Sequence, residues 1–458
     1  MQNYITKFNT EAEYEAFLNS NACPYINVSY IQETDENKYY KEEDELMMQP
    51  FTLHIDQLPD NQEVNFCFET GYTTEKEVVS KLKWKLNNND WQSRDITLSA
   101  PLQETGIMLH EGDTIQVIFK TSFFSGMFYW RDLYGTHDLR YSVSGNIMSL
   151  LWGDDYVYAP ANKIPFEGLK DRGETTVKSF KFNNMFTGGG TNGVVDASDL
   201  WLPTKNLTEN IFQYMFIDNV YLTAAPDIKA KYLPKNACNN MFQNCTSLTD
   251  MPNILAEEIT DGAINGMFEG CSSLVNTTQL HIKKINIITE QSLQNVFKDC
   301  TSLTSVPIWN ENVNIIGDWI GTNMFYGCSS LVSAENFNIR LYGENVSYYF
   351  AYWFNNCQSI EKGPKLGLVT ASNNEVYLNR GIFGTDGSIV DTMYYLNALG
   401  AITCSDGDVF SNYVAANGTV YVSAGSEYLS GGSLYGQLPL GLGSGWTVAE
   451  YVEPNTSN

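Results

Sequence analysis

A phrase of eight residues, MFQNCTSL at 241–248, returns four more times along this chain. The other copies are MFEGCSSL at 267–274, VFKDCTSL at 296–303, MFYGCSSL at 324–331 and WFNNCQSI at 353–360. Their cysteines lie 26, 29, 28 and 29 residues apart. A fixed period of this length is typical of a solenoid, in which each repeat buries its apolar side against its neighbours. The phrase therefore limits the central part of the chain to a stacked-repeat architecture.

Weaker copies extend the array at both ends. Met215-Phe216 and Met185-Phe186 precede the first full copy, and Ile382–Ile389 keeps the apolar frame but lacks the cysteine. We therefore predict about eight repeats within a solenoid domain at 161–394, with divergent end repeats acting as caps.

Each recurring residue has a predicted packing role. We expect the Met-Phe pair to form a short helical turn with Phe inside, and Cys to lie on the same face of that turn. Leu is expected to begin a strand that pairs with neighbouring repeats. The predicted repeat core consists of Phe242, Cys245, Leu248, Phe268, Cys271, Leu274, Phe297, Cys300, Leu303, Phe325, Cys328, Leu331, Phe354 and Cys357.

The five cysteines allow three interpretations. Identical positions in a solenoid stack in a row, where a small apolar thiol suits a buried column. A disulfide ladder is the second interpretation, but it would leave one cysteine over and needs a specific Cα separation. A metal site is the third, but no CxxC or His pairing accompanies the cysteines. We favour the buried column and expect neither metal nor cofactor.

Composition narrows the class of partner. The chain has 458 residues, a formal net charge of −26 and 43% hydrophobic residues. Such acidity argues against binding of nucleic acid, because phosphate contacts need Lys and Arg. No apolar stretch approaches the roughly 20 residues of a membrane-spanning helix, so membrane insertion is not expected. The first eight residues lack a cationic start followed by an apolar run, so no secretory signal is expected.

Three further segments flank the solenoid. Residues 1–50 combine a capping-box pattern at Thr10 and Glu13 with an apolar stripe and a charged run, and we predict a separate N-terminal segment. Residues 51–160 alternate in short runs separated by Asn- and Gly-containing turns, which predicts a β-sandwich-like module. Residues 395–458 are rich in Gly and end in a strand pattern, which predicts a β-rich cap. The fold class expected is thus multidomain and mainly β with short helices.

The MFxGCxSL phrase, followed by LxxxP at Leu248–Pro252 and Leu303–Pro307, resembles the BspA-type leucine-rich repeats of Bacteroidetes surface proteins and their phages. The resemblance covers about residues 180–390. The segments Asn417–Tyr421 and Gly445–Val448 are similar to the terminal part of those proteins, and Val143–Asp155 is similar to the phrase that joins their β module to the repeats. Trp152 stands there where Tyr is commoner.

The N-terminal stretch resembles a different group. Residues 8–17, with Pro24 and Asn27–Tyr30, are similar to the opening of structural proteins, such as head fibres and other appendages, of crAss-like phages of Bacteroides. The resemblance implies that residues 1–50 are a docking and oligomerisation segment, which binds other virion proteins such as capsid, portal or tail. The docking residues it suggests are Phe8, Tyr14, Phe17 and Tyr30.

These observations favour a virion structural protein, such as a head fibre, capsid decoration or tail appendage, that displays the solenoid for host adhesion. A homo-oligomer is expected, with a glycan or protein of the host surface as ligand and Trp309 and Trp319 facing it. The alternatives are a Bacteroidetes cell-surface adhesin and a glycan-degrading tail protein. An enzyme is disfavoured because the four histidines are scattered without a nucleophile motif, and neighbouring carboxylates on a strand face opposite ways.

Overall fold

The computed structural model describes residues 5–6, 27–28, 49–58, 63–70, 78–98, 102–119, 124–131, 138–152, 182–188, 192–204, 207–286, 292–316, 321–343, 352–370, 376–378, 392–395, 402–404, 415–439, 442 and 444–452. The chain forms two compact units. The first comprises 1–181 and 190–207, and the second comprises 182–189 and 208–458.

In its described residues, the first unit consists of short strands and a four-residue helix. Its elements are β1 (Ile5–Thr6), β2 (Asn27–Val28), β3 (Phe51–Gln57), β4 (Val64–Thr70), β5 (Val78–Leu86), β6 (Gln92–Leu98), β7 (Leu102–Leu109), β8 (Thr114–Phe119), β9 (Phe124–Arg131), β10 (Arg140–Asn146), α3 (Ser149–Trp152), β11 (Gly193–Val194) and β12 (Leu200–Trp201). Strands β1 and β2 pair in parallel.

Two larger sheets lie in the described part of this unit. One runs β11-β10-β3-β8-β5-β6, with β12 also paired to β10, and the other runs β7-β4-β9. Strand β3 buries Phe51, Leu53 and Ile55 and leaves the residues between them partly exposed. This alternation is the period-2 pattern of a strand with one buried face, as its sequence predicts.

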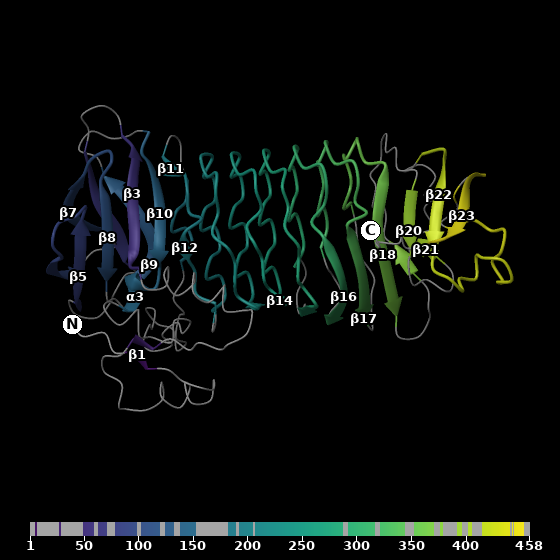
Figure 1. Cartoon of the computed structure of the whole chain (residues 1–458), viewed down its shortest axis with the longest axis horizontal. Helices are drawn as coiled ribbons and strands as arrows, with labels where there is room; N and C mark the ends of the chain where they lie inside the picture. The colour runs from purple at the N-terminus through teal and green to yellow at the C-terminus, as the bar shows by residue number, and fades with distance from the viewer. Residues whose placement is uncertain are drawn as a thin grey trace. The chain divides into compact units, whose positions relative to one another are not determined.

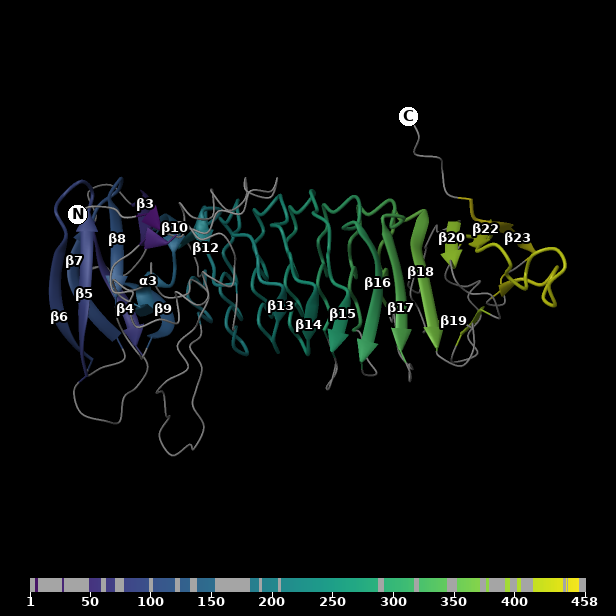
Figure 2. The same ribbon diagram turned by 60° about the horizontal axis from the view of Figure 1, so that its bottom comes forward.

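The second unit is a β-solenoid with a parallel sheet of nine strands, so the predicted mainly-β, solenoid architecture is confirmed. In sheet order the strands are β13 (Tyr232–Leu233), β14 (Glu258–Thr260), β15 (Lys284–Asn286), β16 (Trp309–Ile316), β17 (Phe337–Gly343), β18 (Lys362–Thr370), β20 (Thr392–Tyr395), β22 (Asn417–Val422) and β23 (Gly445–Glu450). A separate parallel pair joins β19 (Val376–Leu378) to β21 (Ile402–Cys404). Figures 1 and 2 show the coils stacked from teal to yellow, with β13–β18 side by side.

Each repeat phrase lies in a run of tight turns that we call the turn face. Its segments are 182–188, 210–219, 236–245, 262–271, 292–300, 321–328 and 352–357. In the segment at 236–245, the amides of Cys238, Asn240 and Phe242 donate to carbonyls of the next coil, at 2.8–2.9 Å. The amides between them donate three residues back, as Met241 does to Cys238 at 3.2 Å. Hydrogen bonds between coils therefore hold this face together without a β-strand.

The predicted helical turn at Met-Phe is wrong. Residues at intervals of four, such as Asn236, Asn240 and Asn244, have φ values of 53°, 52° and 60°. A right-handed helix cannot continue through left-handed residues, and Asn is one of the few residues that adopts this conformation readily. The phrase therefore encodes a succession of turns.

The expectation that the recurring Leu begins a strand is also wrong. Leu248 is followed by an isolated parallel bridge from Asp250 to Asn276, whereas the nearest strand, β14, begins at Glu258. The leucine side chain is nevertheless fully buried. Its role is to fill the interior at the corner where the turns end.

Among the residues that the structure describes, no helix has the length and apolar character needed to cross a membrane.

Candidate functional site

The recurring residues of the repeat all lie inside the solenoid. Their exposed fractions are between 0 and 3%. The set is Phe242, Cys245, Leu248, Phe268, Cys271, Leu274, Phe297, Cys300, Leu303, Phe325, Cys328, Leu331, Phe354 and Cys357. None of these side chains is available to a ligand, so a binding site has to be built from the residues that vary between coils.

A column of phenylalanine rings runs along the solenoid axis. The rings of Phe186, Phe216, Phe242, Phe268, Phe297, Phe325 and Phe354 stack in sequence order. Successive centroids are 5.2–5.5 Å apart, and the interplanar angle falls to 2° between Phe297 and Phe325. The spacing is close to the distance between paired strands, so each coil contributes one ring per step.

The cysteine thiols have a specific partner. Cys271 Sγ donates to the carbonyl of Phe242 in the preceding coil at 3.1 Å, and Cys245 makes the same bond to Phe216. Cys300, Cys328 and Cys357 repeat the bond at 3.0–3.2 Å. A thiol is a weak donor, but here it satisfies a buried carbonyl that would otherwise carry a free lone pair.

Asn219 shows what this position requires. It lies 26 residues before Cys245 and is fully buried. Its side-chain Nδ2 donates to the carbonyl of Phe186 in the preceding coil, as the thiols do, and to Phe216 at 3.1 Å. Because an amide can replace the thiol, the shared property is a small donor aimed at the preceding coil, and not sulfur chemistry.

The thiols are unsuited to nucleophilic or metal chemistry. All five are free and buried, and burial raises the pKa of Cys271 to about 12. Burial raises the pKa of Cys245, Cys300 and Cys328 as well. Nucleophilic attack and metal ligation both need a thiolate, and a raised pKa suppresses it. Within the described ranges, no group of three His, Cys, Asp or Glu side chains is arranged to hold a metal ion.

Three rows of left-handed residues run along the turn face. The first is Asn184, Tyr214, Asn240, Gly266, Asn295, Asn323 and Tyr352, the second is Asp218, Asn244, Gly270, Asp299, Gly327 and Asn356, and the third is Asn210, Asn236 and Gly262. Glycine is needed where a side chain of the preceding coil leans over it. A Cβ on Gly270 would lie 2.3 Å from Asn244 Oδ1, and one on Gly327 would lie 2.2 Å from Asp299 Oδ1.

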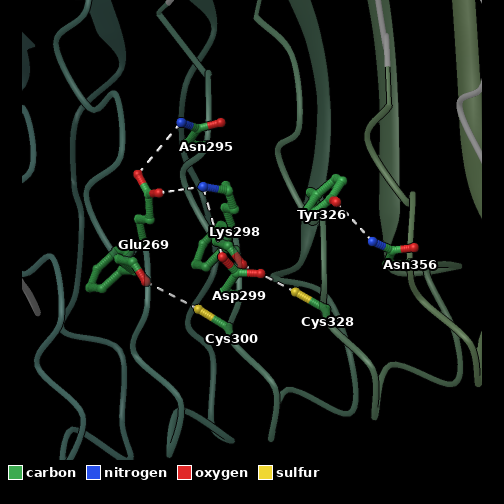
Figure 3. Close-up of polar contacts among 10 residues, drawn as sticks. Glu269, Asn295, Lys298, Asp299, Cys300, Tyr326, Cys328 and Asn356 are labelled. Atoms are coloured by element: carbon green, nitrogen blue, oxygen red, sulfur yellow. Dashed lines mark hydrogen bonds and ion pairs between the residues drawn. The ribbon is translucent and has the colours of Figure 1, made fainter. Parts of the chain in front are cut away.

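Polar side chains that differ from coil to coil make up the accessible surface of the turn face. Glu269 accepts from Lys298 Nζ at 2.6 Å, and Asn295 Nδ2 lies 3.5 Å from the other oxygen of the same carboxylate. Hydrogen bonding to Glu269 is the main cause of a raised pKa at Lys298. Two coils further on, Asn356 Nδ2 donates to the Tyr326 hydroxyl at 2.8 Å (Figure 3). This surface combines an ion pair, amides and a phenol.

Exposed ion pairs between neighbouring coils line the beginning of strands β13–β15. Glu257 Oε1 lies 2.9 Å from Lys231 Nζ, and Glu257 Oε2 lies 3.6 Å from Lys283 Nζ. The hydrogen bond from Lys231 is the main cause that lowers the pKa of Glu257. Glu258 pairs with Lys284 at 3.0 Å. Both members of the Glu257-Glu258 pair are thus paired with lysines of adjacent coils.

The expectation that Trp309 faces a ligand is wrong. Its side chain is fully buried, its Nε1 donates to the carbonyl of Ile282 at 3.0 Å, and its ring packs edge-on against Phe337 at 5.1 Å. A buried indole needs a partner for its N–H, and the preceding coil supplies it. Trp319 lies outside the described residues, as do the suggested docking residues Phe8, Tyr14, Phe17 and Tyr30.

Sequence reasoning missed the tyrosines of the turn face. Tyr214 and Tyr352 have φ values of 57° and 55°, at positions where the other coils have Asn or Gly. A signal was present, because aligning the repeats on Met-Phe places both tyrosines in the column before Met or Trp that otherwise holds Asn or Gly. This signal could be interpreted only once the residues of that column were known to have left-handed backbone conformations.

No family model, curated protein or solved structure matches the chain.

Proposed function

We propose that this chain is a structural protein of a bacteriophage virion, as a head fibre, capsid decoration or tail appendage. In this proposal its solenoid is displayed for adhesion to the host surface. One observation carries the adhesive part: the recurring residues Phe, Cys and Leu are all buried, so that stacked coils form a constant scaffold with a variable surface. A scaffold of this kind supports extended binding surfaces.

The virion part of the proposal rests on the resemblance of residues 8–30 to phage structural proteins. In this proposal, residues 1–50 dock on capsid, portal or tail proteins and make contacts between copies of the chain. Residues 51–160 form a sandwich-like spacer, the solenoid is of the BspA type and residues 395–458 cover its end. No catalytic step is assigned to the chain.

Particle incorporation tests the proposal. The full chain and a variant lacking residues 1–45 are each supplied to infected host cells, and purified particles are probed with an antibody against the solenoid. We expect the full chain in the particles and loss of the truncated chain, while circular dichroism shows that the truncated chain keeps its β content. Equal incorporation of both chains would contradict docking through the N-terminus.

A matched control removes the ambiguity of a folding defect. Lys231→Gln alters an exposed ion pair at the start of a strand and leaves residues 1–50 intact. This variant should enter particles normally. If the full chain is absent from particles and is instead found on the surface of uninfected Bacteroidetes cells, the virion assignment is wrong and the cell-surface adhesin replaces it.

A further inference from the structure

Two tyrosines occupy backbone positions that are unfavourable for them. In the first left-handed row, five coils place Asn or Gly, whereas Tyr214 and Tyr352 adopt φ values of 57° and 55°. For a residue with a large side chain, the left-handed conformation costs roughly 1–2 kcal/mol relative to the right-handed one. Such strain persists where the surrounding structure imposes it, and it gathers at functional sites.

Tyr352 differs from Tyr214 in what surrounds it. Its side chain is 40% exposed, which makes it one of the few large apolar groups on the described surface. The preceding coil contributes Tyr326, which is partly exposed and whose hydroxyl is held by Asn356 Nδ2 at 2.8 Å. The coil preceding Tyr214 has Thr187 at the position equivalent to Tyr326, so Tyr214 lacks the second phenol.

Hydrogen-bonding groups continue from these tyrosines along the turn face. Lys298 and Asn295 hold the Glu269 carboxylate at 2.6 and 3.5 Å, and the Asp299 side chain is 49% exposed (Figure 3). Asn295 and Asp299 thus add partly exposed hydrogen-bonding groups to the same face.

We propose that Tyr326 and Tyr352, together with Asn295, Lys298 and Asn356, bind a neutral polysaccharide along the turn face. This inference rests on the adhesive role proposed above and names the ligand class. A tyrosine ring offers an apolar face to the C–H groups of a sugar and a hydroxyl to its polar edge. Fixed amides and a charged pair beside the rings supply the few placed polar groups that orient such a ligand.

The spacing of the coils and the charge of the chain both favour a neutral polysaccharide as the ligand. Phe325 and Phe354, which mark the coils that contribute Tyr326 and Tyr352, are 5.2 Å apart, so a polysaccharide lying along the axis would contact a new coil at each such step. The chain carries a net charge of −26, and Glu269 and Asp299 lie at the patch. An anionic polysaccharide would be repelled by this surface, whereas a neutral one would not.

The test exploits the strain at Tyr352. Tyr352→Asn removes the ring and installs the residue that neighbouring coils use at this position, so the variant should melt at the same or a higher temperature than the wild type. Binding of the full-length chain to mannan, β-glucan and galactan is measured by affinity electrophoresis, with alginate as the anionic comparison. We expect retardation by at least one neutral polysaccharide and an affinity loss of at least about tenfold for Tyr352→Asn, which corresponds to about 1.4 kcal/mol.

Two variants serve as matched controls. Tyr214→Asn makes the same substitution in the same row but away from the patch, and it should leave the affinity unchanged. Tyr352→Phe keeps the ring and should retain most of the binding. The inference is overturned if no neutral polysaccharide retards the wild type, if alginate binds as tightly, or if Tyr352→Asn binds like the wild type. A lower melting temperature for Tyr352→Asn would also count against it.

Particle incorporation separates this inference from the proposed function. Tyr352→Asn leaves residues 1–50 unchanged, so it should enter particles as the wild type does. Incorporation without polysaccharide binding by the wild type would refute only the ligand, whereas failure of incorporation would refute the virion assignment.

Discussion

The turn face and the sheet β13–β23 hold the same coils together in different ways. On the turn face, every second amide donates to the next coil, and the buried side chains recur as Phe and, in five coils, Cys. In the sheet, strand length varies from two residues in β13 to nine in β18, and exposed Lys-Glu pairs line its first strands. The buried and left-handed positions of the turn face thus vary little in sequence, whereas the sheet varies more.

The difference follows from what each backbone needs. Left-handed residues at intervals of four restrict the turn face to Asn, Gly and Asp at most of those positions, because other residues are strained there. Parallel strands need only an extended backbone and one buried side chain in alternate positions, which many sequences satisfy. We therefore expect stability to depend mainly on the interior behind the turn face.

The largest effect is expected for Phe268→Ala. This ring is fully buried between those of Phe242 and Phe297, at 5.5 Å from each. Its removal leaves a cavity in the middle of the stack and should lower the free energy of unfolding by about 3–5 kcal/mol. Urea denaturation followed by tryptophan fluorescence measures the change.

Its control is Val275→Ala, which truncates a side chain that is 40% exposed in the same coil. Surface changes of this kind usually remain within about 0.5 kcal/mol. Comparable destabilisation by both variants would mean that the interior of the turn face does not dominate.

An intermediate effect is expected at Asn219. Asn219→Ala leaves the buried carbonyl of Phe186 without its side-chain donor, which should cost about 1–3 kcal/mol. Asn219→Cys restores a donor of the type used by the five following coils and should recover part of that loss. Thermal melting of the three proteins measures the order wild type, Cys, Ala. If Cys and Ala destabilise equally, the thiol bond of the repeat has no energetic role.

The sequence predicted the solenoid and its interior because one residue at a fixed period is enough to define a stacked column. It did not predict the backbone, because Asn before Met or Cys suits both a helix boundary and a left-handed turn. The hydrogen bonds to the next coil, such as that from the Phe242 amide to the Met267 carbonyl at 2.9 Å, favour the left-handed turn. The prediction for Trp309 was wrong for a related reason. Whether a strand residue is exposed depends on the register of its strand, and the uneven spacing of the repeats concealed that register. Tyr352 was missed because its constraint is conformational, and composition carries no sign of it.

The smallest effect is expected in the sheet, for Glu257→Gln. This carboxylate lies between Lys231 and Lys283 at 2.9 and 3.6 Å, and its side chain is 41% exposed. Exposed pairs contribute about 0–1 kcal/mol, and added salt weakens them.

The folded-state pKa of Glu257 is lowered below its usual value of 4.5, so the contribution is present above about pH 4.5 and is lost as the pH falls through the folded pKa. The variant should therefore differ from the wild type by less than about 1 kcal/mol at pH 7 in low salt and converge with it in acid below the folded pKa or in 1 M NaCl. Urea titrations under the three conditions measure the difference. A loss that persists in acid or in salt would show that the lysine pairs hold the coils together by more than charge, and the sheet would then be as restrictive as the turn face.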